Sequence, residues 1–488
     1  MTLGRTAVVL GGSVAGMCTA GALTDHFDQV VVLERDVLPE DAEHRRGVPQ
    51  SKHPHFLLNS GRRAIGELFD GFEADLIGGG GMLLNPSLDA AYLEEKGWAA
   101  RKESSMTMVY SSRILIERVL RDRVRKLANV TVREGVSVDG LQFTDGAVTG
   151  VSFTQDGTSE TIDADLVVDT MGRGSSVMAW LAQAGYPEPP IKTLDAKVTY
   201  VSRWYDLPAD ADRPHDWWWK HIVIMPSVEN DPNRPDEHYY LSNFFPIDGN
   251  RAIACMGSWG LKMPRTPDEL TASAGRLRTP LFLEAMDGST PTSEVHLTRS
   301  TGNVWRRFDK VAKAPAGLVF IGDSICAFNP FYAQGMSSAS SSAVLLKKSL
   351  DQLSALDAGF AQRFTKDQVA LLKVPWGMAM ARDRGYEVGE GTETVPRWQQ
   401  KVMAFAGGKA FQLIVGAARE DEVIDEHFSK VFNLDESMGE MFKSPRVLFG
   451  LARYQVKSLF GRTKVPFGFD PLQAPPATDY SKSKQVTA

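Results

Sequence analysis

The stretch "VLGGSVAGMC" at residues 9–18 is a glycine-rich turn between two apolar segments. The dinucleotide-binding pattern G-x-G-x-x-G would place its glycines at positions 11, 13 and 16, which read Gly11, Ser13 and Gly16, with an extra glycine at Gly12. In that pattern the first glycine allows a tight turn, the second lets the backbone approach a pyrophosphate, and the third lets helix and strand pack closely. Serine is small and its hydroxyl can donate to a phosphate at a helix N-terminus, so we expect a nucleotide site despite Ser13.

The flanking segments support this interpretation. "TAVVL" (6–10) is a buried type of strand, "VAGMCTAGAL" (14–23) is a small-residue helix, and "VVVLERD" (30–36) is a second strand. Glu34 follows Gly11 by 23 positions, close to the ~20 expected for a carboxylate that binds a ribose. The segment therefore predicts a β-α-β unit. Arg35 either contacts the nucleotide or is a solvated residue at the strand end, and the sequence leaves both open.

Composition narrows the class of protein. The chain has 488 residues, a net charge of −6 and no long basic run, which argues against nucleic acid as a partner. Its three cysteines, Cys18, Cys255 and Cys326, form no C-x-x-C pair, so we expect neither a disulfide framework nor a structural metal, and a cytoplasmic location. We predict no transmembrane segment. The most apolar stretch, "MAFAGGKAFQLIVGAA" (403–418), is expected to be a buried helix.

Two later segments repeat the order strand, glycine turn, helix. They are "DADLVVDTMGRGSSVMAWL" (163–181) and "GLVFIGDSICAFNPFYAQGMSSASSSAVLLKKSL" (317–350). Between the first two motifs, "SSRILIERVLRDRV" (111–124) reads as an amphipathic helix that begins near Arg113. A carboxylate such as Asp323 at a strand end can accept from hydroxyl groups, and a helix beginning near Gly335 offers free N–H groups.

Taken together, the opening unit, "DTMGRGS" and "GDSICAFNP" resemble the three fingerprints of flavoprotein monooxygenases of the para-hydroxybenzoate hydroxylase type. The resemblance covers about residues 1–365 and departs from the pattern at Ser13 and Thr170. It implies an α/β fold: a Rossmann-like FAD-binding domain with an antiparallel-sheet substrate domain and a helical C-terminal region. It also implies non-covalent FAD, held at its pyrophosphate by the first loop and at its ribityl and phosphate part by Gly322-Asp323, with NAD(P)H as reductant. Thr170 weakens the inference about the nicotinamide cofactor.

A closer similarity lies at "HRRGVPQSKHPHFLLNSG" (44–61) and "GDSICAFNPFYAQGMS" (322–337), which look like the flavin epoxidases of polyether biosynthesis, such as the lasalocid and monensin epoxidases. On this basis we expect the first segment to wrap the flavin. His53 and His55 form an H-x-H pair, but no third ligand stands nearby and Pro54 separates them, so we expect no metal. They are hydrogen-bonded histidines or a proton relay. The expected cofactor-binding residues are Gly11, Gly12, Ser13, Ala15, Gly16, Glu34, Arg35, Arg46, Gly47, Val48, Arg113, Val136, Asp169, Gly172, Gly322, Asp323, Pro330, Gly335 and Met336.

The middle of the chain has a different sequence pattern. Segments 196–207, 221–228, 238–247 and 251–260 read as antiparallel strands, with a turn at Asp248-Gly249-Asn250. Their aromatic residues suggest a roomy apolar pocket, for which we select Trp217, Phe244 and Phe245. We place the FAD-binding domain at 1–72, 101–185 and 296–365, the substrate domain at 73–100 and 186–295, and a helical cap at 366–488.

The predicted function follows from the resemblance. It is FAD-dependent insertion of one oxygen atom from O2 into a large hydrophobic natural-product intermediate, through a flavin hydroperoxide, with alkene epoxidation preferred to aromatic-ring hydroxylation. Other readings are a flavin halogenase, for which "DWWWKHIVIMP" (216–226) is a loose match, a geranylgeranyl-reductase-like saturase, and a non-catalytic carrier with the same fold. The sequence does not determine the substrate, the choice of NADH or NADPH, or the oligomeric state.

Overall fold

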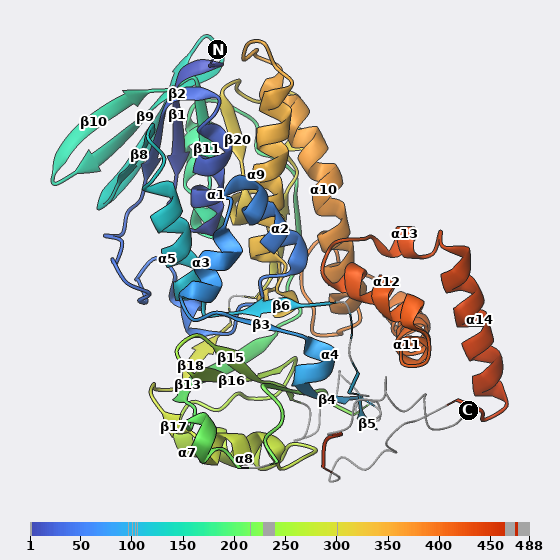
Figure 1. Cartoon of the computed structure of the whole chain (residues 1–488). Helices are drawn as coiled ribbons and strands as arrows, with labels where there is room; N and C mark the ends of the chain where they lie inside the picture. Colours follow the sequence, from blue (N-terminus) through green and yellow to red (C-terminus); the bar gives the residue numbers. More distant parts are fainter. Residues whose placement is uncertain are drawn as a thin grey trace.

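Five parallel strands from distant parts of the chain form the central sheet, in the order β20-β11-β1-β2-β7 (Figure 1). The strands are β1 (Gly4–Leu10), β2 (Phe27–Leu33), β7 (Val130–Arg133), β11 (Leu166–Asp169) and β20 (Leu318–Phe320). The computed structural model describes residues 2–95, 97–99, 101–102, 104, 106–214, 216–227, 240–299, 301–463 and 474–476. Successive residues of β1 alternate between two apolar clusters, Ala7 and Val9 in one and Val8 and Leu10 in the other. The sheet is therefore buried on both faces, as parallel sheets are.

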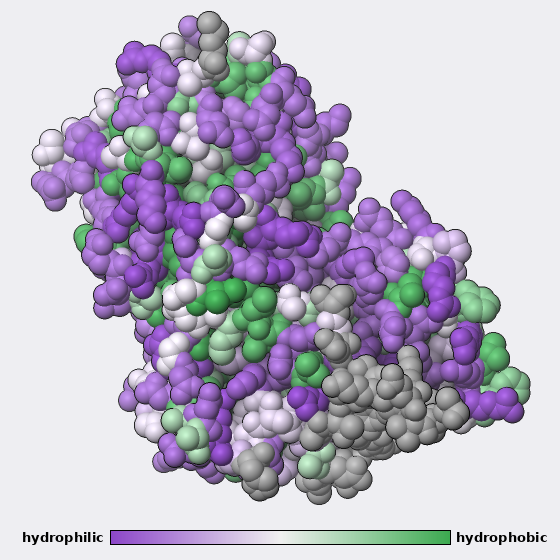
Figure 2. All heavy atoms as spheres, in the orientation of Figure 1, coloured by the Kyte–Doolittle hydropathy of each residue, from purple (hydrophilic) through white to green (hydrophobic). Residues whose placement is uncertain are grey.

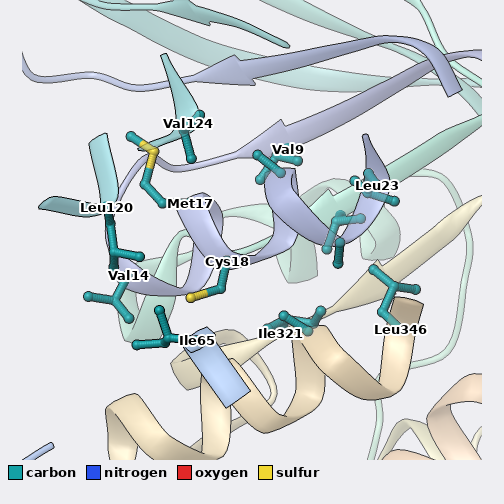
Figure 3. Close-up of a cluster of buried hydrophobic side chains, with 14 of the residues drawn as sticks. Val9, Val14, Met17, Cys18, Leu23, Ile65, Leu120, Val124, Ile321 and Leu346 are labelled. Atoms are coloured by element: carbon teal, nitrogen blue, oxygen red, sulfur yellow. The ribbon is translucent and has the colours of Figure 1, made fainter. Parts of the chain in front are cut away.

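One face of this sheet is covered by helices α1 (Val14–Leu23), α2 (Asn59–Leu68), α3 (Phe72–Gly78), α5 (Arg113–Val124) and α9 (Gly335–Asp351). Figure 3 shows Met17 and Cys18 of α1 among side chains from these neighbouring helices and strands. Helix α1 has almost no polar face, because nine of its ten residues are buried. The small residues of the opening segment thus let α1 lie in the centre of the domain, with its N-terminus at the carboxyl end of β1.

The other face is covered by a three-stranded antiparallel sheet and two helices. The strands are β8 (Val136–Thr144), β9 (Ala147–Gln155) and β10 (Thr158–Asp163), and the helices are α6 (Val177–Gln183) and α10 (Phe360–Asp383). Two smaller sheets join the domains: β12 (Ile191–Leu194), β19 (Asn303–Arg306) and β21 (Cys326–Ala327), and the pair β3 (Met82–Leu84) and β6 (Met108–Tyr110).

A second large sheet lies beyond the carboxyl ends of the central strands (Figure 1). Its strands β13 (Thr199–Asp206), β16 (Arg251–Ser258), β15 (Leu241–Ile247) and β14 (His221–Ile224) are antiparallel, as predicted. Asp248–Asn250 makes the predicted turn, with positive φ at Gly249 (75°) and Asn250 (55°). Short strands β4 (Ala90–Glu94), β5 (Gly97–Trp98), β17 (Thr290–Pro291) and β18 (His296–Thr298) extend the edges, and β4 pairs with β14 in parallel.

The two faces of this sheet have different neighbours. One packs against helices α7 (Pro267–Ala274) and α8 (Leu281–Asp287), with Phe244 against Phe282. The other faces the domain of the central parallel sheet, where Phe245 and Trp204 share an apolar cluster with Tyr110 of β6. Strand alternation produces this division, and it decides which side chains face the other domain.

The described C-terminal region is helical, as predicted. It contains the end of α10, then α11 (Arg397–Ala418), α12 (Glu422–Phe432), α13 (Met438–Met441) and α14 (Pro445–Leu459). Residues 464–473 and 477–488 of the predicted cap lie outside the described residues. The expectation of a buried helix at 403–418 was wrong in part: the segment is helical, but residues 405–411 are exposed. Among the described residues, no helix is both long enough and apolar enough to cross a membrane.

Candidate functional site

The first glycine loop has the tight geometry that its sequence predicts. Gly11 has a φ of +101°, which favours glycine, and its N–H donates to the carbonyl of Leu33. A Cβ atom on Gly16 would lie 1.8 Å from the Gly11 carbonyl oxygen. The Gly12 N–H donates to Glu34 Oε2 at 2.6 Å. The loop, the helix start and the acid at the end of β2 therefore form one unit, as expected.

Ser13 is the N-cap position of α1, but its hydroxyl is directed to a neighbouring helix. It donates to Glu117 Oε1 of α5 at 2.7 Å and accepts from the Arg113 guanidinium at 2.8 Å. A hydroxyl has one hydrogen to donate. In this structure Glu117 takes that hydrogen, and donation from Ser13 to a phosphate stays a prediction.

Ser13 belongs to a buried network of ionic groups. Arg113 also donates to Glu117, at 2.9–3.0 Å. Arg45 contacts Glu117 at 3.0 Å, and it contacts two further carboxylates, Asp36 at 2.8 Å and Glu34 at 3.2 Å. Burial by itself would raise the pKa of Glu117, but Arg113, Arg45 and the Ser13 hydroxyl outweigh it and lower the pKa to about 2. Glu117 is therefore a buried carboxylate held ionised by two arginines.

The two adjacent arginines have different surroundings, and the predicted cofactor contact of Arg46 stays a prediction. Arg45 is the buried member of the network, whereas Arg46 and Arg35 are exposed. The predicted neighbours do lie there: the Gly47 N–H donates to Asp36 at 2.7 Å, and Val48 is buried. Val136 is buried too, and its N–H donates to the Glu34 carbonyl at 2.9 Å. Nothing in "HRRG" distinguishes the two arginines, and no pattern pointed to Glu117.

The second motif forms a turn that its own acid orders. The buried Asp169 carboxylate accepts from the Met171 N–H at 2.9 Å and from the Ser175 hydroxyl at 2.6 Å. Burial raises the pKa of Asp169 to about 6, against these hydrogen bonds. Thr170 donates to the carbonyl of Leu10 at 2.7 Å. The threonine that replaces the usual glycine therefore ties this turn to the first loop.

The turn of the third motif lies against the turns of the first two, although the three are far apart in the sequence. A Cβ atom on Gly322, whose φ is +77°, would lie 3.0 Å from Ala15 Cβ of α1. One on Gly172 would lie 3.9 Å from Asp323 Cβ, and one on Gly335 would lie 3.9 Å from Asp323 Oδ1. The turns thus meet at the carboxyl end of the parallel sheet.

Asp323 lies partly exposed at this meeting point. Its side chain is 39% exposed and lies 3.4 Å from Arg173 Nε. The pKa of Asp323 is nevertheless raised, because many protein atoms surround the carboxyl, and Arg173 opposes this rise. Arg306 donates to the carbonyl oxygens of Asp323 and Ser324 at 3.2 and 3.0 Å and so supports the turn. Sequence reasoning named neither Arg173 nor Arg306 as a site residue.

Helix α9 begins beside Asp323, after Pro330 and a residue with positive φ, Ala333 (55°). Gly335 and the buried Met336 form its first turn, as predicted. The hydroxyls of Ser337 and Ser338 are buried and have no hydrogen-bond partner within the structure. The first N–H groups of a helix also lack intrahelical acceptors. This end of α9 therefore offers donors toward an electron-rich group.

The two histidines of the H-x-H pair are neutral at neutral pH. Burial lowers the pKa of His53 to about 3 and that of His55 to about 4. His53 Nδ1 bonds with the Ser202 hydroxyl at 2.8 Å, and His55 Nδ1 donates to the His53 carbonyl at 2.9 Å. Within the described part of the chain, no three His, Cys, Asp or Glu side chains gather as metal ligands.

The three predicted pocket aromatics lie on two different sides of the substrate-domain sheet. Trp217 and Phe244 pack in the apolar layer beside α8, away from the three turns. Phe245 lies on the opposite face, with Tyr110 and Phe56. Alternation thus leaves Phe245 as the one of the three that faces the other domain.

That face also carries polar groups that sequence reasoning missed. His221 Nε2 donates to Asn243 Oδ1 at 3.0 Å, and the Tyr110 hydroxyl contacts His221 Nδ1 at 3.3 Å. Burial lowers the pKa of His221 to about 4 and raises that of Tyr110 well above its usual value. The face therefore has hydrogen-bonding groups but no charged base at neutral pH among these residues. Only the strand register reveals that they share a face.

Comparison with known proteins gives one relative in sequence. No family model matches the chain. Protein Rv3254 of Mycobacterium tuberculosis is 31% identical over 446 residues, which cover 88% of this chain and 90% of that protein. The chain belongs to the Rv3254 family.

Comparison with solved structures identifies the fold of this member of the Rv3254 family. The flavin-dependent brominase Bmp2 matches with a TM-score of 0.62 at 12% identity, over 94% of this chain and 100% of that one. The p-nitrophenol 4-monooxygenase PnpA from Pseudomonas putida matches with 0.58 at 15% identity, over 89% and 99%. PqsL, a probable FAD-dependent monooxygenase from Pseudomonas aeruginosa, matches with 0.58 at 17% identity, over 79% and 97%. The Rv3254-family chain thus has the α/β fold of FAD-dependent monooxygenases.

Proposed function

We propose that the protein is an FAD-dependent monooxygenase that transfers one atom of O2 to a large hydrophobic substrate, with alkene epoxidation as the reaction and NAD(P)H as the reductant. The observation that carries the proposal is the meeting of the three glycine turns at the carboxyl end of one parallel sheet, opposite an antiparallel sheet. Open parallel sheets bind ligands at this edge.

The residues at this edge fit a bound FAD. The glycines of the Gly11–Gly16 loop let the turn pack closely on Thr170, Glu34 and the start of α1, as a dinucleotide-binding turn requires, and Glu34 has a carboxylate lone pair left for a ribose. Asp323 is partly exposed where the three turns meet and suits the ribityl hydroxyls. The free N–H groups at the start of α9 suit the electron-rich edge of the ring. When bound, FAD would supply the redox chemistry and the activation of O2.

The protein's own residues would prepare the substrate side. Phe245, Phe56 and Tyr110 form a buried apolar cluster on the side of the antiparallel sheet that faces the other domain, and such a cluster would exclude water and contact a hydrocarbon. His53, His55 and His221 are neutral near pH 7 because burial lowers the pKa of each. A phenol hydroxylase needs a group that takes the phenol proton. These neutral, hydrogen-bonded imidazoles have low pKa values and are weak bases, which favours an alkene substrate over a phenol.

Halogenation is the second candidate, because the chain also matches a protein described as a brominase. In this chain Trp217 and Trp219, from the stretch that loosely matches a halogenase motif, pack on each other beside α8 with ring centroids 4.8 Å apart. They are therefore on the face of the sheet that is turned away from the three turns. This placement favours oxygenation.

Replacement of Asp323 by Ala is expected to weaken FAD binding more than replacement of Asp169. The Asp323 carboxylate is partly exposed, whereas both Asp169 oxygens bond within their own turn. Loss of a charge-assisted contact to the cofactor costs about 1.5–3 kcal/mol, or roughly 10- to 150-fold in affinity. Titration of each flavin-free variant with FAD, followed by fluorescence, measures both constants. Equal affinities, or a larger loss for Asp169→Ala, would contradict the assignment of Asp323.

Turnover under ¹⁸O2 tests the reaction. Each cycle is expected to consume one NAD(P)H, to place one labelled oxygen atom in the product and to release the other as water. The substrates to supply are a polyene and a terpenoid, together with a matched phenol, and the products are read by mass spectrometry. A product that gains bromine in the presence of bromide, a product that gains two hydrogens, or turnover that continues without O2 would refute the proposal. Selective use of the phenol would replace epoxidation by ring hydroxylation.

A further inference from the structure

The C-terminal helices α11–α14 carry an unusual share of exposed apolar side chains. Of the seventeen large hydrophobic residues that are exposed in the described part of the chain, eleven lie between residues 397 and 460. Figure 2 shows apolar atoms at the right-hand edge of the molecule, over α14. Scattered single apolar residues on a surface are ordinary, whereas such a concentration marks an interaction surface. The eleven are Trp398, Val402, Phe405, Phe411, Phe432, Phe442, Leu448, Phe449, Val456, Leu459 and Phe460.

In α14 these residues form a single face. At about 100° per residue, Leu448, Phe449, Val456, Leu459 and Phe460 fall within roughly a third of the helix circumference. Phe449 and Phe460, just past the helix end, are 62% and 71% exposed. The opposite face, with Val447 and Leu451, is buried against the rest of the bundle. Helix α14 thus has two apolar faces, one packed inside the bundle and the other open to solvent.

Helix α11 is even less covered. Trp398, Val402 and Phe405 follow each other at helical spacing and are 57–66% exposed. From residue 405 to 411 every residue is exposed, and Cβ atoms placed on Gly407 and Gly408 would meet no atom within 4 Å. Two consecutive glycines weaken a helix in water by about 1 kcal/mol each relative to alanine. A bare helix of this composition gains stability when an apolar medium covers it.

The charge on these two helices has one sign. Helix α11 contains Arg397, Lys401 and Lys409, helix α14 contains Arg446, Arg453 and Lys457, and neither contains an acidic residue. The whole chain, by contrast, has a net charge of −6. Arg446 and Lys457 pair with Asp421 and Glu420 of the segment before α12. Arg397, Lys401 and Arg453 make no ion pair with the described residues, and Lys409 lies 4.2 Å from the centre of the Phe405 ring.

We propose that α11 and α14 form a docking surface for an anionic lipid bilayer, on which the protein lies with these helices in the interface. Exposed Trp, Phe and Leu beside Lys and Arg, with no acid, is the pattern of interfacial helices. The aromatic side chains enter the headgroup and acyl boundary, and the basic side chains contact the lipid phosphates. A second protein copy would bring the same basic residues against each other, so a lipid surface is the better match in charge.

The direct test is sedimentation of the intact protein with vesicles of phosphatidylcholine alone or with 30% phosphatidylglycerol. We expect binding to the anionic vesicles that weakens at high salt. The double variant Phe449→Ser with Phe460→Ser is expected to bind at least about tenfold more weakly. The variant Lys401→Gln with Arg453→Gln is expected to lose about 25-fold on anionic vesicles, at about fivefold per charge, and to change little on neutral ones. Val37→Ser removes an apolar side chain that is 77% exposed outside these helices and serves as the matched control.

A second measurement does not depend on the stability of the serine variant. Brominated lipid in anionic vesicles should quench the fluorescence of Trp398. The quenched part of the fluorescence should be absent from Trp398→Phe, which should still sediment with the vesicles. The proposal is overturned if the wild-type protein stays in the supernatant with anionic vesicles. It is also overturned if the serine variant binds as well as the wild type. If light scattering shows a dimer that the serine substitutions dissociate, and vesicles are not bound, a second copy covers this surface instead.

Discussion

Replacement of Gly16 by Ala is expected to abolish stable FAD binding. The added Cβ atom would lie 1.8 Å from the Gly11 carbonyl oxygen, a backbone atom that cannot rotate away. Relief requires α1 to move away from the loop, which distorts the phosphate site at the same time. Overpacking of this severity costs more than about 3 kcal/mol, or at least about 100-fold in affinity. Flavin absorbance that remains with the purified variant after gel filtration measures the effect.

Gly66→Ala is the matched control, because a Cβ atom at that position of α2 would meet nothing within 4 Å. It is expected to retain the flavin and to be slightly more stable, since alanine favours a helix. Circular dichroism of Gly16→Ala distinguishes loss of the site from loss of the fold. A folded, yellow Gly16→Ala protein with wild-type affinity for FAD would disprove the geometry of the loop.

Replacement of Glu117 by Gln is expected to lower the free energy of unfolding by about 3 kcal/mol at pH 7. The native pKa of about 2 lies below the ordinary value of 4.5, and each unit of difference is worth about 1.4 kcal/mol. The substitution also leaves Arg113 and Arg45 without their shared partner, and breaking one member of a buried pair costs about 3–5 kcal/mol.

The pH dependence gives this prediction a distinct signature. A lowered native pKa stabilises the protein fully above pH 4.5, and this contribution is lost as the pH falls toward 2. The difference between wild type and Glu117→Gln should therefore be constant from pH 7 to pH 5 and fall to about half by pH 3. Urea titrations with FAD in excess measure it at each pH. Glu67→Gln, at a half-exposed pair with Lys348, is the control and should change little. A difference that does not change down to pH 3 would contradict the ionised state of Glu117.

Local sequence patterns predicted the strands and turns of the parallel-sheet domain. Its strands are short β-branched runs that end at glycine turns, and such units fold with the turn at the carboxyl edge whatever lies between them in sequence. The resemblance of the three motifs to flavoprotein fingerprints predicted the α/β fold and assigned Gly11, Asp169 and Asp323 to one cofactor, although more than 150 residues separate the second from the third. The structure brings these three turns together. The hairpin at Asp248–Asn250 and the helical C-terminal region were predicted from local patterns.

What the sequence did not reveal depends on long-range register. Arg45 and Arg46 are identical in type, and only the fold decides which one meets Glu117 and Glu34. Phe244 and Phe245 are equally apolar, and alternation puts them on opposite faces, but only the packing of the sheet decides that Phe245 is the one that faces the other domain. The parallel pairing of β4 with β14 joins residues about 130 positions apart, and no local pattern predicts it.

The expectation for α11 failed for a different reason. An apolar segment was assumed to be covered by the protein's own core, because water disfavours exposed apolar surface. Phe405 and its neighbours are nevertheless exposed in this structure. Apolar composition predicts that a segment is covered, but it does not specify by what.

The order of strands in the central sheet governs how the chain is built during synthesis. β11 lies between β1 and β20, and β20 begins about 150 residues after β11 ends. At about 5–20 residues per second, the ribosome needs roughly 10–30 s to make that stretch. During this time one edge of β11, with its unpaired N–H and C=O groups, is available for pairing with another chain. Nascent chains that end before Phe320 are therefore expected to expose an unpaired strand edge, which is a general cause of aggregation.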